Sequence, residues 1–383
     1  MSNLLTWLEI SKSSLIHNLK QFKKVISPKI QLMAVVKSNA YGHGLIECAR
    51  IFEKAGADWL GVVNLDEALA LKKTGLKKPV MVLSYFDASP GSLGPLTQAI
   101  KKGVRLPIYD FKTAKWLSSI ALKAHKTAYL HLKIDTGTSR LGALPSESVG
   151  FIKRLLKLPN LQLEGLFSHL ADSENPNQTF TNKQIDTFEK LITKLEKQGI
   201  NIPLRHLACS AATILNKRSW FNMVRIGISL YGLYSIQDGL QKIKRKYPWF
   251  YLKPALSWYT KVIQVKELST GTNIGYGLTY KAKRKTKIAV LPIGYWDGYD
   301  RKLSNQADVL IHGQRAPVRG RVCMNIAMVD ITDISNVRVG DRVTLIGCDG
   351  KEEITADELA KKIGTINYEV VTRINPLLTR LYK

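Results

Sequence analysis

The stretch QLMAVVKSNAYGHG, residues 31–44, determines how the rest of this chain is interpreted. Its apolar run ends at Val36, and Lys37 follows directly, where a buried strand would end. Burial lowers the pKa of an amine, and an unprotonated amine can form a Schiff base with a carbonyl cofactor. Lys37 is therefore predicted to be reactive, although most of the 57 Lys and Arg residues are expected only to solvate the surface.

Length and composition set the broad class of the protein. A chain of 383 residues with 45% hydrophobic content is long enough for two packed domains, expected at residues 1–245 and 246–383. Met1 to Ile10 lacks the pattern of a secretion signal, and no stretch has the length of a membrane span, so a soluble cytoplasmic protein is expected. The four cysteines are far apart and lack metal-ligand spacing, which disfavours disulfides and a metal site.

The net charge of +27 raises the question of nucleic-acid binding. The basic residues are spread along helical segments such as 152–158 and 188–198, and no recognisable binding module is present. We therefore expect no nucleic-acid partner.

Eight short apolar runs alternate with longer amphipathic stretches between residues 30 and 232. The runs are Leu32–Val36, Trp59–Val63, Val80–Ser84, Arg105–Tyr109, Tyr129–Ile134, Leu163–Ser168, Leu204–Ala208 and Met223–Ile228. Alternation of this kind is typical of repeated β-α units with a parallel sheet, and eight such units predict an α/β fold of the (β/α)₈ barrel type. Such barrels carry their chemistry on the loops that follow the strands.

Polar residues follow several of these runs. They are Lys37, Asn64, Asp135, Arg140, His169, Ser210 and Arg225, the last with Gly227 two positions later. One such residue is more often structural than functional. Their shared position at strand ends favours a functional site at one end of the barrel.

After residues 237–247 the sequence pattern changes to short β-rich segments with little helical periodicity. The expected strands are 255–265, 286–292, 308–311, 321–330 and 342–346. A second, mainly β domain is predicted, and the early strand Thr6–Ile10 is a candidate to pack with it.

Several ordered motifs resemble those of the alanine racemase family over essentially the whole chain. They are AVVKSNAYGHG at 34–44, KIDTGTSRLG at 133–142, FNMVRIGI at 221–228, IGYG at 274–277, PIGY at 292–295, GRVCM at 320–324 and INYE at 366–369. This resemblance implies a pyridoxal 5'-phosphate enzyme, with a barrel followed by a β domain, that interconverts L-alanine and D-alanine and supplies D-alanine for peptidoglycan.

The resemblance implies two catalytic bases. Lys37 would hold the cofactor covalently and serve the face of the substrate that gives up the proton of D-alanine. Tyr276 would serve the opposite face, assisted by His169 and Arg225, because an unassisted phenol has a pKa near 10. Arg225 can only donate to the ring nitrogen of the cofactor, which would stay unprotonated and disfavour side reactions such as transamination.

The other implied contacts divide between cofactor and substrate. The cofactor phosphate would be bound by Tyr41, Ser210, Gly227, Ile228 and Tyr368. Arg140, Met324 and Asn325 are the implied substrate-binding residues. Lys133 aligns with a lysine that is often carbamylated in the family, and an unmodified lysine or a chloride in its place stays an open alternative.

One departure from the family pattern concerns substrate range. The motif usually reads Cys-Met-Asp, and here Asn325 follows Met324, so one negative charge is lost. Tyr368 is bulky and favours alanine over larger substrates. In the family Tyr276, Met324 and Asn325 reach the site of a partner subunit, so a homodimer is expected.

Three alternatives stay open at this point. One is a racemase of broader or different amino-acid specificity. Another is a pyridoxal-phosphate-dependent decarboxylase of the same fold, which would present an acidic residue where Arg225 stands. The third is a non-catalytic carrier of the cofactor built on a lone barrel, which would need neither a β domain nor Tyr276.

Overall fold

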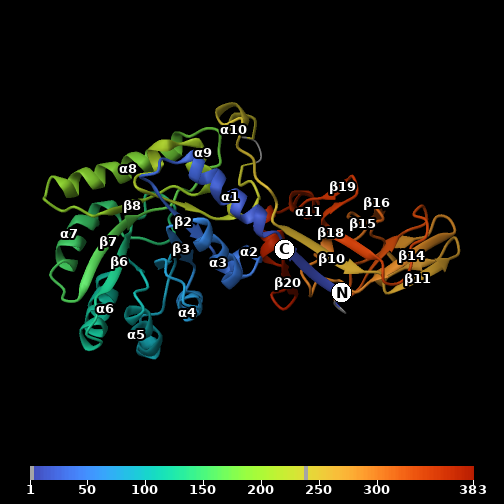
Figure 1. Cartoon of the computed structure of the whole chain (residues 1–383), viewed down its shortest axis with the longest axis horizontal. Coiled ribbons are helices and arrows are strands. Elements are labelled where there is room, and N and C mark those ends of the chain that lie inside the picture. The colour runs from blue at the N-terminus through green and yellow to red at the C-terminus, as the bar shows by residue number, and fades with distance from the viewer. Residues whose placement is uncertain (1–3, 237–239) are drawn as a thin grey trace. The chain divides into compact units, whose positions relative to one another are not determined.

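A computed structural model describes residues 4–236 and 240–383 (Figure 1). The chain divides into two compact units, each described by itself below. The barrel unit comprises 14–40 and 45–253, and the β unit comprises the N-terminal 13 residues, 41–44 and 254–383. The first three residues lie outside the described chain. So do residues 237–239, which are part of the segment where the sequence pattern is predicted to change. The predicted domain boundary at residue 245 stays a prediction.

The barrel unit is built on a closed sheet of parallel strands in the order β4-β3-β2-β9-β8-β7-β6-β5. The strands are β2 (Gln31–Val35), β3 (Trp59–Val62), β4 (Val80–Val82), β5 (Leu106–Ile108), β6 (Ala128–Lys133), β7 (Leu161–Phe167), β8 (Leu204–His206) and β9 (Met223–Ile226). The barrel sheet closes beside β4. Arg105 N donates to the Val80 carbonyl, and Val82 N donates to the Arg105 carbonyl, both at 2.9 Å. Each strand overlaps one predicted apolar run, so the eight-stranded parallel barrel is confirmed.

Side chains from several strands fill the barrel interior. Met33, Trp59, Met81, Phe167 and Met223 form one buried cluster contributed by β2, β3, β4, β7 and β9. The interior is therefore a packed core, and chemistry is confined to the strand ends.

Helices follow the strands and cover the outside of the barrel (Figure 1). They are α1 (Lys12–Val25), α3 (Leu45–Ala55), α4 (Leu65–Lys73), α5 (Leu93–Lys101), α6 (Phe111–Lys123), α7 (Pro145–Leu155), α8 (Thr179–Glu196), α9 (Ser210–Leu215) and α10 (Leu240–Lys246). The Asn64 side chain accepts from Glu67 N at 3.0 Å and begins α4. The polar residue after β3 is therefore a helix cap, a structural role.

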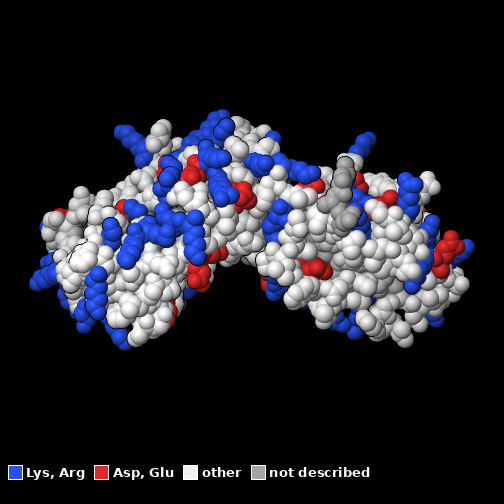
Figure 2. Space-filling view, turned by 60° about the horizontal axis from the view of Figure 1, so that its bottom comes forward, with Lys and Arg blue, Asp and Glu red and all other residues white. Residues whose placement is uncertain are grey.

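Basic residues occupy the last turns of many of these helices, for example Lys72 and Lys73 in α4 and Lys153 and Arg154 in α7. Positive charge at a helix C-terminus is favourable because it complements the helix dipole. Figure 2 shows Lys and Arg side chains scattered over both units, with Asp and Glu sparser between them. This distribution agrees with the helical spread of charge read from the sequence. No helix among the described residues is long and apolar enough to cross a membrane.

The β unit contains a sheet in the order β16-β15-β18-β10-β1-β20 with β19 paired to β18, a three-stranded sheet β11-β14-β17 and the pair β12-β13. Its strands are β1 (Thr6–Ile10), β10 (Leu256–Lys261), β11 (Gln264–Leu268), β12 (Asn273–Ile274), β13 (Tyr280–Lys281), β14 (Thr286–Leu291), β15 (Asp308–Ile311), β16 (Gln314–Pro317), β17 (Ala327–Asp330), β18 (Arg342–Asp349), β19 (Glu352–Ile354) and β20 (Thr379–Tyr382). β1 pairs antiparallel with β10 and parallel with β20, so the two ends of the chain enter one sheet.

The structure corrects three predictions for this unit. The single strand expected at 255–265 is two strands, β10 and β11. The strand expected at 321–330 begins only at Ala327, because the residues before it form a loop. The expected lack of helices is wrong for α11 (Ala356–Ile363) and α12 (Asn367–Thr372), whose short amphipathic patterns were too brief to stand out.

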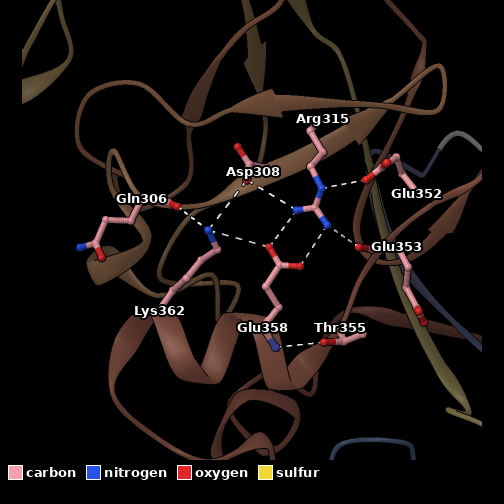
Figure 3. Close-up of polar contacts among 8 residues, drawn as sticks. All are labelled: Gln306, Asp308, Arg315, Glu352, Glu353, Thr355, Glu358 and Lys362. Carbon is pink, nitrogen blue, oxygen red and sulfur yellow. Dashed lines mark hydrogen bonds and ion pairs between the residues drawn. The ribbon is translucent and has the colours of Figure 1, made fainter.

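A cluster of charged side chains joins α11 to the neighbouring strands (Figure 3). Arg315 on β16 donates to Glu352 Oε2 at 2.8 Å, to Glu358 Oε1 at 2.9 Å and to the Glu353 carbonyl at 2.7 Å. Lys362 on α11 donates to the Gln306 carbonyl at 2.7 Å. One guanidinium therefore connects β16, β19 and α11.

Replacing Arg315 with methionine is expected to lower the free energy of unfolding by about 1–2 kcal/mol, because several partners lose one shared donor. Arg284→Met is the matched control, since Arg284 in the same unit is more exposed and pairs only with Asp333 among the described ion pairs. Urea unfolding of both variants checks this. Equal losses in the two variants would contradict the structural role of Arg315.

Candidate active site

Lys37 is the first residue of the segment α2 (Lys37–Tyr41), two residues after β2 ends at Val35. Burial lowers its pKa, the positive charge of Arg140 lowers it further, and Glu67 opposes the shift. This is the direction predicted for an amine at the mouth of a buried strand.

The residues after Lys37 adopt an unusual backbone. Ser38, Asn39, Ala40 and Tyr41 have φ values of 56°, 54°, 52° and 52°, a left-handed conformation that L residues rarely adopt in succession. Side chains of the barrel unit hold the first half of this turn, because Glu67 Oε1 accepts from Asn39 N at 3.0 Å and Asn39 Oδ1 accepts from Leu45 N at 2.9 Å. Backbone strain of this kind is found at functional sites, where the surroundings enforce it.

The second half of the turn belongs to the β unit. Arg380 Nε donates to the Gly42 carbonyl at 2.8 Å, and the Tyr382 hydroxyl donates to the His43 carbonyl at 2.8 Å. A Cβ on Gly42 would lie 2.1 Å from the Val371 carbonyl oxygen, so only glycine fits there. The sequence did not identify Arg380 and Tyr382, because no local pattern shows that the C-terminal strand supports residues 41–44.

Arg225 lies on β9 and is 6% exposed. It donates through Nη1 to His206 Nδ1 at 2.8 Å and to the His206 carbonyl at 2.8 Å, and through Nη2 to the carbonyls of Ser168 at 2.7 Å and Leu207 at 3.0 Å. His169 Nδ1 lies 3.4 Å from the same Nη2. Burial lowers the pKa of Arg225 to about 10, so it remains a cation at neutral pH.

Lys133 lies at the end of β6 near several other cationic groups. Burial, together with the positive charges of Arg140, Arg225 and Lys37, lowers the pKa of Lys133 to about 8, and Asp135 opposes the shift. Its Nζ donates to the Leu83 carbonyl at 3.4 Å. Lys133 therefore has a substantial unprotonated fraction near neutral pH.

His169 is also affected by these cations. Burial, together with the charges of Arg225, Arg140 and Lys37, lowers its pKa to about 3. The imidazole of His169 beside Arg225 is therefore neutral.

Asp135 has a structural role in the loop that carries Arg140. Its carboxylate accepts hydrogen bonds from the backbone N–H groups of 137–140 and so shapes this loop.

Ser210, Gly227 and Ile228 meet at the ends of β8 and β9. Ser210 begins α9, and its Oγ accepts from Gly227 N at 3.1 Å, which leaves the hydroxyl proton of Ser210 for another acceptor. Ile228 begins a 3₁₀ turn, Ile228–Tyr231, whose first N–H groups have no partner within the turn. Hydroxyl and amide donors at one point suit a phosphate group.

In the β unit, Tyr41 packs edge-on against Tyr368 with ring centroids 6.1 Å apart. Tyr276 begins the 3₁₀ turn Tyr276–Leu278 between two glycines of positive φ and is 73% exposed. A Cβ on Gly277 would lie 2.9 Å from the guanidinium carbon of Arg321, so this turn adjoins the loop that leads to Met324 and Asn325. Met324 is 55% exposed, and Asn325 is exposed as well.

The residues of each unit thus form recognisable groups. The barrel unit brings together Lys37, Lys133, Arg140, His169 and Arg225, with the Ser210 and Gly227 pair at neighbouring strand ends. The donors suit an anionic cofactor, and the amine of low pKa suits a carbonyl. A parallel barrel with this set of groups, followed by a mainly β unit, defines the class of pyridoxal-phosphate enzymes with two domains.

Comparison with known proteins identifies the family within that class. The model of the alanine racemase N-terminal domain matches residues 10–235, and that of the alanine racemase C-terminal domain matches residues 255–382. The chain belongs to the alanine racemase family, whose activity is that of a pyridoxal-phosphate-dependent isomerase.

Relatives aligned over nearly their whole length and solved structures support the same family assignment. The chain is 42% identical over 377 residues to the alanine racemase of Methanococcus maripaludis, covering 98% of each protein. It is 41% identical over 378 residues to that of Halothermothrix orenii, covering 99% of this chain and 97% of the relative. The solved alanine racemase of Clostridium difficile 630 superposes with a TM-score of 0.92 at 35% identity, covering 100% of this chain and 97% of that one. The Bacillus anthracis enzyme with bound L-Ala-P gives a TM-score of 0.90 at 35% identity, with 100% and 96% covered.

The lowered pKa of Lys133 predicts a pH dependence of stability. The amine has a pKa near 8 in the folded protein and an ordinary value of 10.5 in the unfolded chain, so the unfolded chain binds more protons between these values. Stability therefore rises with pH in this window. Relative to Lys133→Met, the wild-type protein should gain about 2 kcal/mol of unfolding free energy from about pH 7 to about pH 10.

Urea unfolding of the cofactor-free protein in buffers depleted of carbon dioxide measures this difference. Lys183→Met, at an exposed position on α8, is the control and should track the wild type. A constant difference between the wild type and Lys133→Met across the pH range would refute the low pKa.

Proposed function

We propose that this chain interconverts L-alanine and D-alanine by a two-base mechanism and that the D-alanine serves peptidoglycan synthesis in the cytoplasm. The observation that carries the proposal is Arg225, a buried guanidinium whose described hydrogen-bond partners are backbone carbonyls and imidazole nitrogens. A guanidinium only donates, so it would leave the ring nitrogen of the cofactor unprotonated. A decarboxylase of the same fold would present a carboxylate there.

The residues that would hold the cofactor are those that the family resemblance implies. Lys37 would hold it covalently, while Ser210, Gly227 and Ile228 would bind its phosphate. Tyr41, Tyr368 and His169 complete the proposed contacts. When bound, the cofactor withdraws electrons from the substrate Cα and makes its hydrogen acidic.

The proton would be moved by two side chains on opposite faces of that carbon. Lys37 Nζ would take it from D-alanine, in agreement with a lowered pKa that favours the unprotonated amine. The Tyr276 hydroxyl would take it from L-alanine. Removal from only one face would not exchange the two enantiomers, so both groups are needed.

A homodimer would complete the site. Tyr276, Met324 and Asn325 are exposed in the single chain, as expected of side chains supplied to the barrel of a second copy. We propose that each barrel receives these three residues from its partner.

Arg140 would bind the substrate carboxylate, and Lys133 would carry a carbamate that orients Arg140. The lowered pKa of Lys133 supports this, because carbon dioxide reacts with the unprotonated amine and a carbamate would place a negative charge among three cations. Asn325 would contact the substrate without the charge of the usual aspartate. Tyr368 would restrict the substrate side chain, which favours alanine over serine and lysine.

Racemisation of L-alanine by the purified protein with pyridoxal phosphate tests the proposal directly. The rate should exceed the rates with L-serine and L-lysine. Lys37→Ala should abolish both activity and the borohydride-reducible bond to the cofactor, whereas Lys183→Ala at an exposed position should retain both. A reducible bond that persists in Lys37→Ala would locate the covalent anchor elsewhere.

Tyr276→Phe tests the assignment of the second base. Loss of a positioned base costs roughly 10²–10⁴-fold in proton transfer. Cα exchange in deuterated water should therefore slow by that factor from L-alanine and much less from D-alanine. Tyr85→Phe is the control, because Tyr85 is an exposed residue of the barrel unit. Equal slowing from both enantiomers would count against the assignment.

A further inference from the structure

A line of hydrogen bonds crosses the barrel interior from Arg225. Arg225 Nη1 lies 2.8 Å from His206 Nδ1, and His206 Nε2 lies 2.9 Å from His131 Nδ1. His131 Nε2 lies 3.4 Å from Glu164 Oε2. Arg105 then donates to Glu164 through Nε at 2.9 Å and through Nη2 at 3.1 Å. Both imidazoles are fully buried, and Glu164 is 16% exposed.

The chemistry of the two ends fixes every proton between them. Arg225 has only donors, so His206 Nδ1 must accept and its single proton lies on Nε2. His206 then donates to His131 Nδ1, which places the His131 proton on Nε2. Glu164, as a carboxylate, accepts that proton. We call these three residues, His206, His131 and Glu164, the relay.

The ionisation of the relay agrees with this pattern. Burial lowers the pKa of His131 and of His206, so both imidazoles are neutral at neutral pH. Burial alone would raise the pKa of Glu164, but hydrogen bonds from His131 and Arg105 lower it to about 2. The carboxylate is therefore charged throughout the working range of pH.

The fold makes room for this line of contacts. A Cβ on Gly165 would lie 2.1 Å from His131 Nδ1, so only glycine can follow Glu164 without displacing His131. The pairing of β6 with β7 shifts register between Leu130 and His131. The Phe167 ring stacks on His206, with centroids 5.0 Å apart and planes 6° apart, and shields that ring from water.

We propose that Glu164 is a positioning residue for Arg225: through the fixed tautomers of His131 and His206, it keeps His206 Nδ1 an acceptor and so aims the guanidinium at the cofactor ring. This rests on the proposed function, in which the ring nitrogen accepts from Arg225. Without a carboxylate, His131 can reverse its tautomer, and reversal along the relay would point the His206 Nδ1 proton at a donor of Arg225.

Glu164→Gln removes the charge and offers His131 an amide that can donate or accept. ¹⁵N NMR of histidine-labelled, cofactor-free protein reports tautomers directly and is independent of catalysis. The wild type should show both relay imidazoles with the proton on Nε2, and Glu164→Gln should show mixed tautomers at both. His131→Asn and His206→Asn assign the signals among the seven histidines.

Asp58→Asn is the matched control. Asp58 is a partly buried carboxylate of the same barrel that accepts from Leu32 N at 2.8 Å and pairs with Lys23, away from the relay. It should leave the tautomers unchanged. Glu164→Asp keeps the charge and should retain the wild-type tautomers, which separates the effect of charge from a general loss of folding.

Spectrophotometric titration with pyridoxal phosphate provides the second readout. The affinity of Glu164→Gln should fall roughly tenfold, the loss expected when one hydrogen bond from a charged donor is misaligned. Unchanged tautomers in Glu164→Gln would overturn the proposal, as would changed tautomers with wild-type affinity. Failure of the proposed function would be seen separately, as a wild-type protein that does not racemise alanine.

Discussion

Burial of several cationic groups close together at the mouth of the barrel is the constraint on which the rest of this site depends. Lys37, Lys133 and His169 each have a pKa that is lowered first by burial and then by neighbouring positive charge, with Arg140 acting on all three. Such a cluster is costly in an empty protein. It is favourable when a phosphate, a phenolic oxygen and a substrate carboxylate bring negative charge, so the electrostatics favour an anionic cofactor and an amino-acid substrate.

The fold holds these charges in place without neutralising them. Arg225 is satisfied by carbonyls and by His206, which leaves its full charge available to a ligand. Carboxylates near the site offset this charge only in part, because Glu67 opposes the lowering of the Lys37 pKa and Asp135 that of the Lys133 pKa. Glu67 and Asp135 bind backbone N–H groups of the loops that carry Lys37 and Arg140, and Glu164 lies two imidazoles away from Arg225. Anions of the protein thus shape the site, and the positive charge faces the ligand.

The sequence predicted those features that have a local signature. Most strands of the barrel are apolar runs, because they are buried on both faces, and Lys37 and Arg225 stand out as charges next to or within such runs. Asn64 could not be told from the site residues by sequence, because a helix cap and a reactive residue occupy the same kind of position. The helices α11 and α12 were missed because each spans only two turns. His206, His131 and Glu164 escaped notice because their meaning lies in contacts between strands far apart in sequence, which only the closed barrel brings together.

Proton uptake on ligand binding tests the account most directly. Pyridoxine 5'-phosphate has no carbonyl and binds without a covalent bond, so calorimetry in buffers of different ionisation enthalpy reports protonation alone. Because the Lys133 pKa is near 8, a bound anion that raises it should cause net proton uptake by the carbon-dioxide-free protein at about that pH, and Lys133→Met should take up markedly less. Binding without proton uptake, or with proton release, would contradict the claim that the bound anion relieves the cost of burying these cations together.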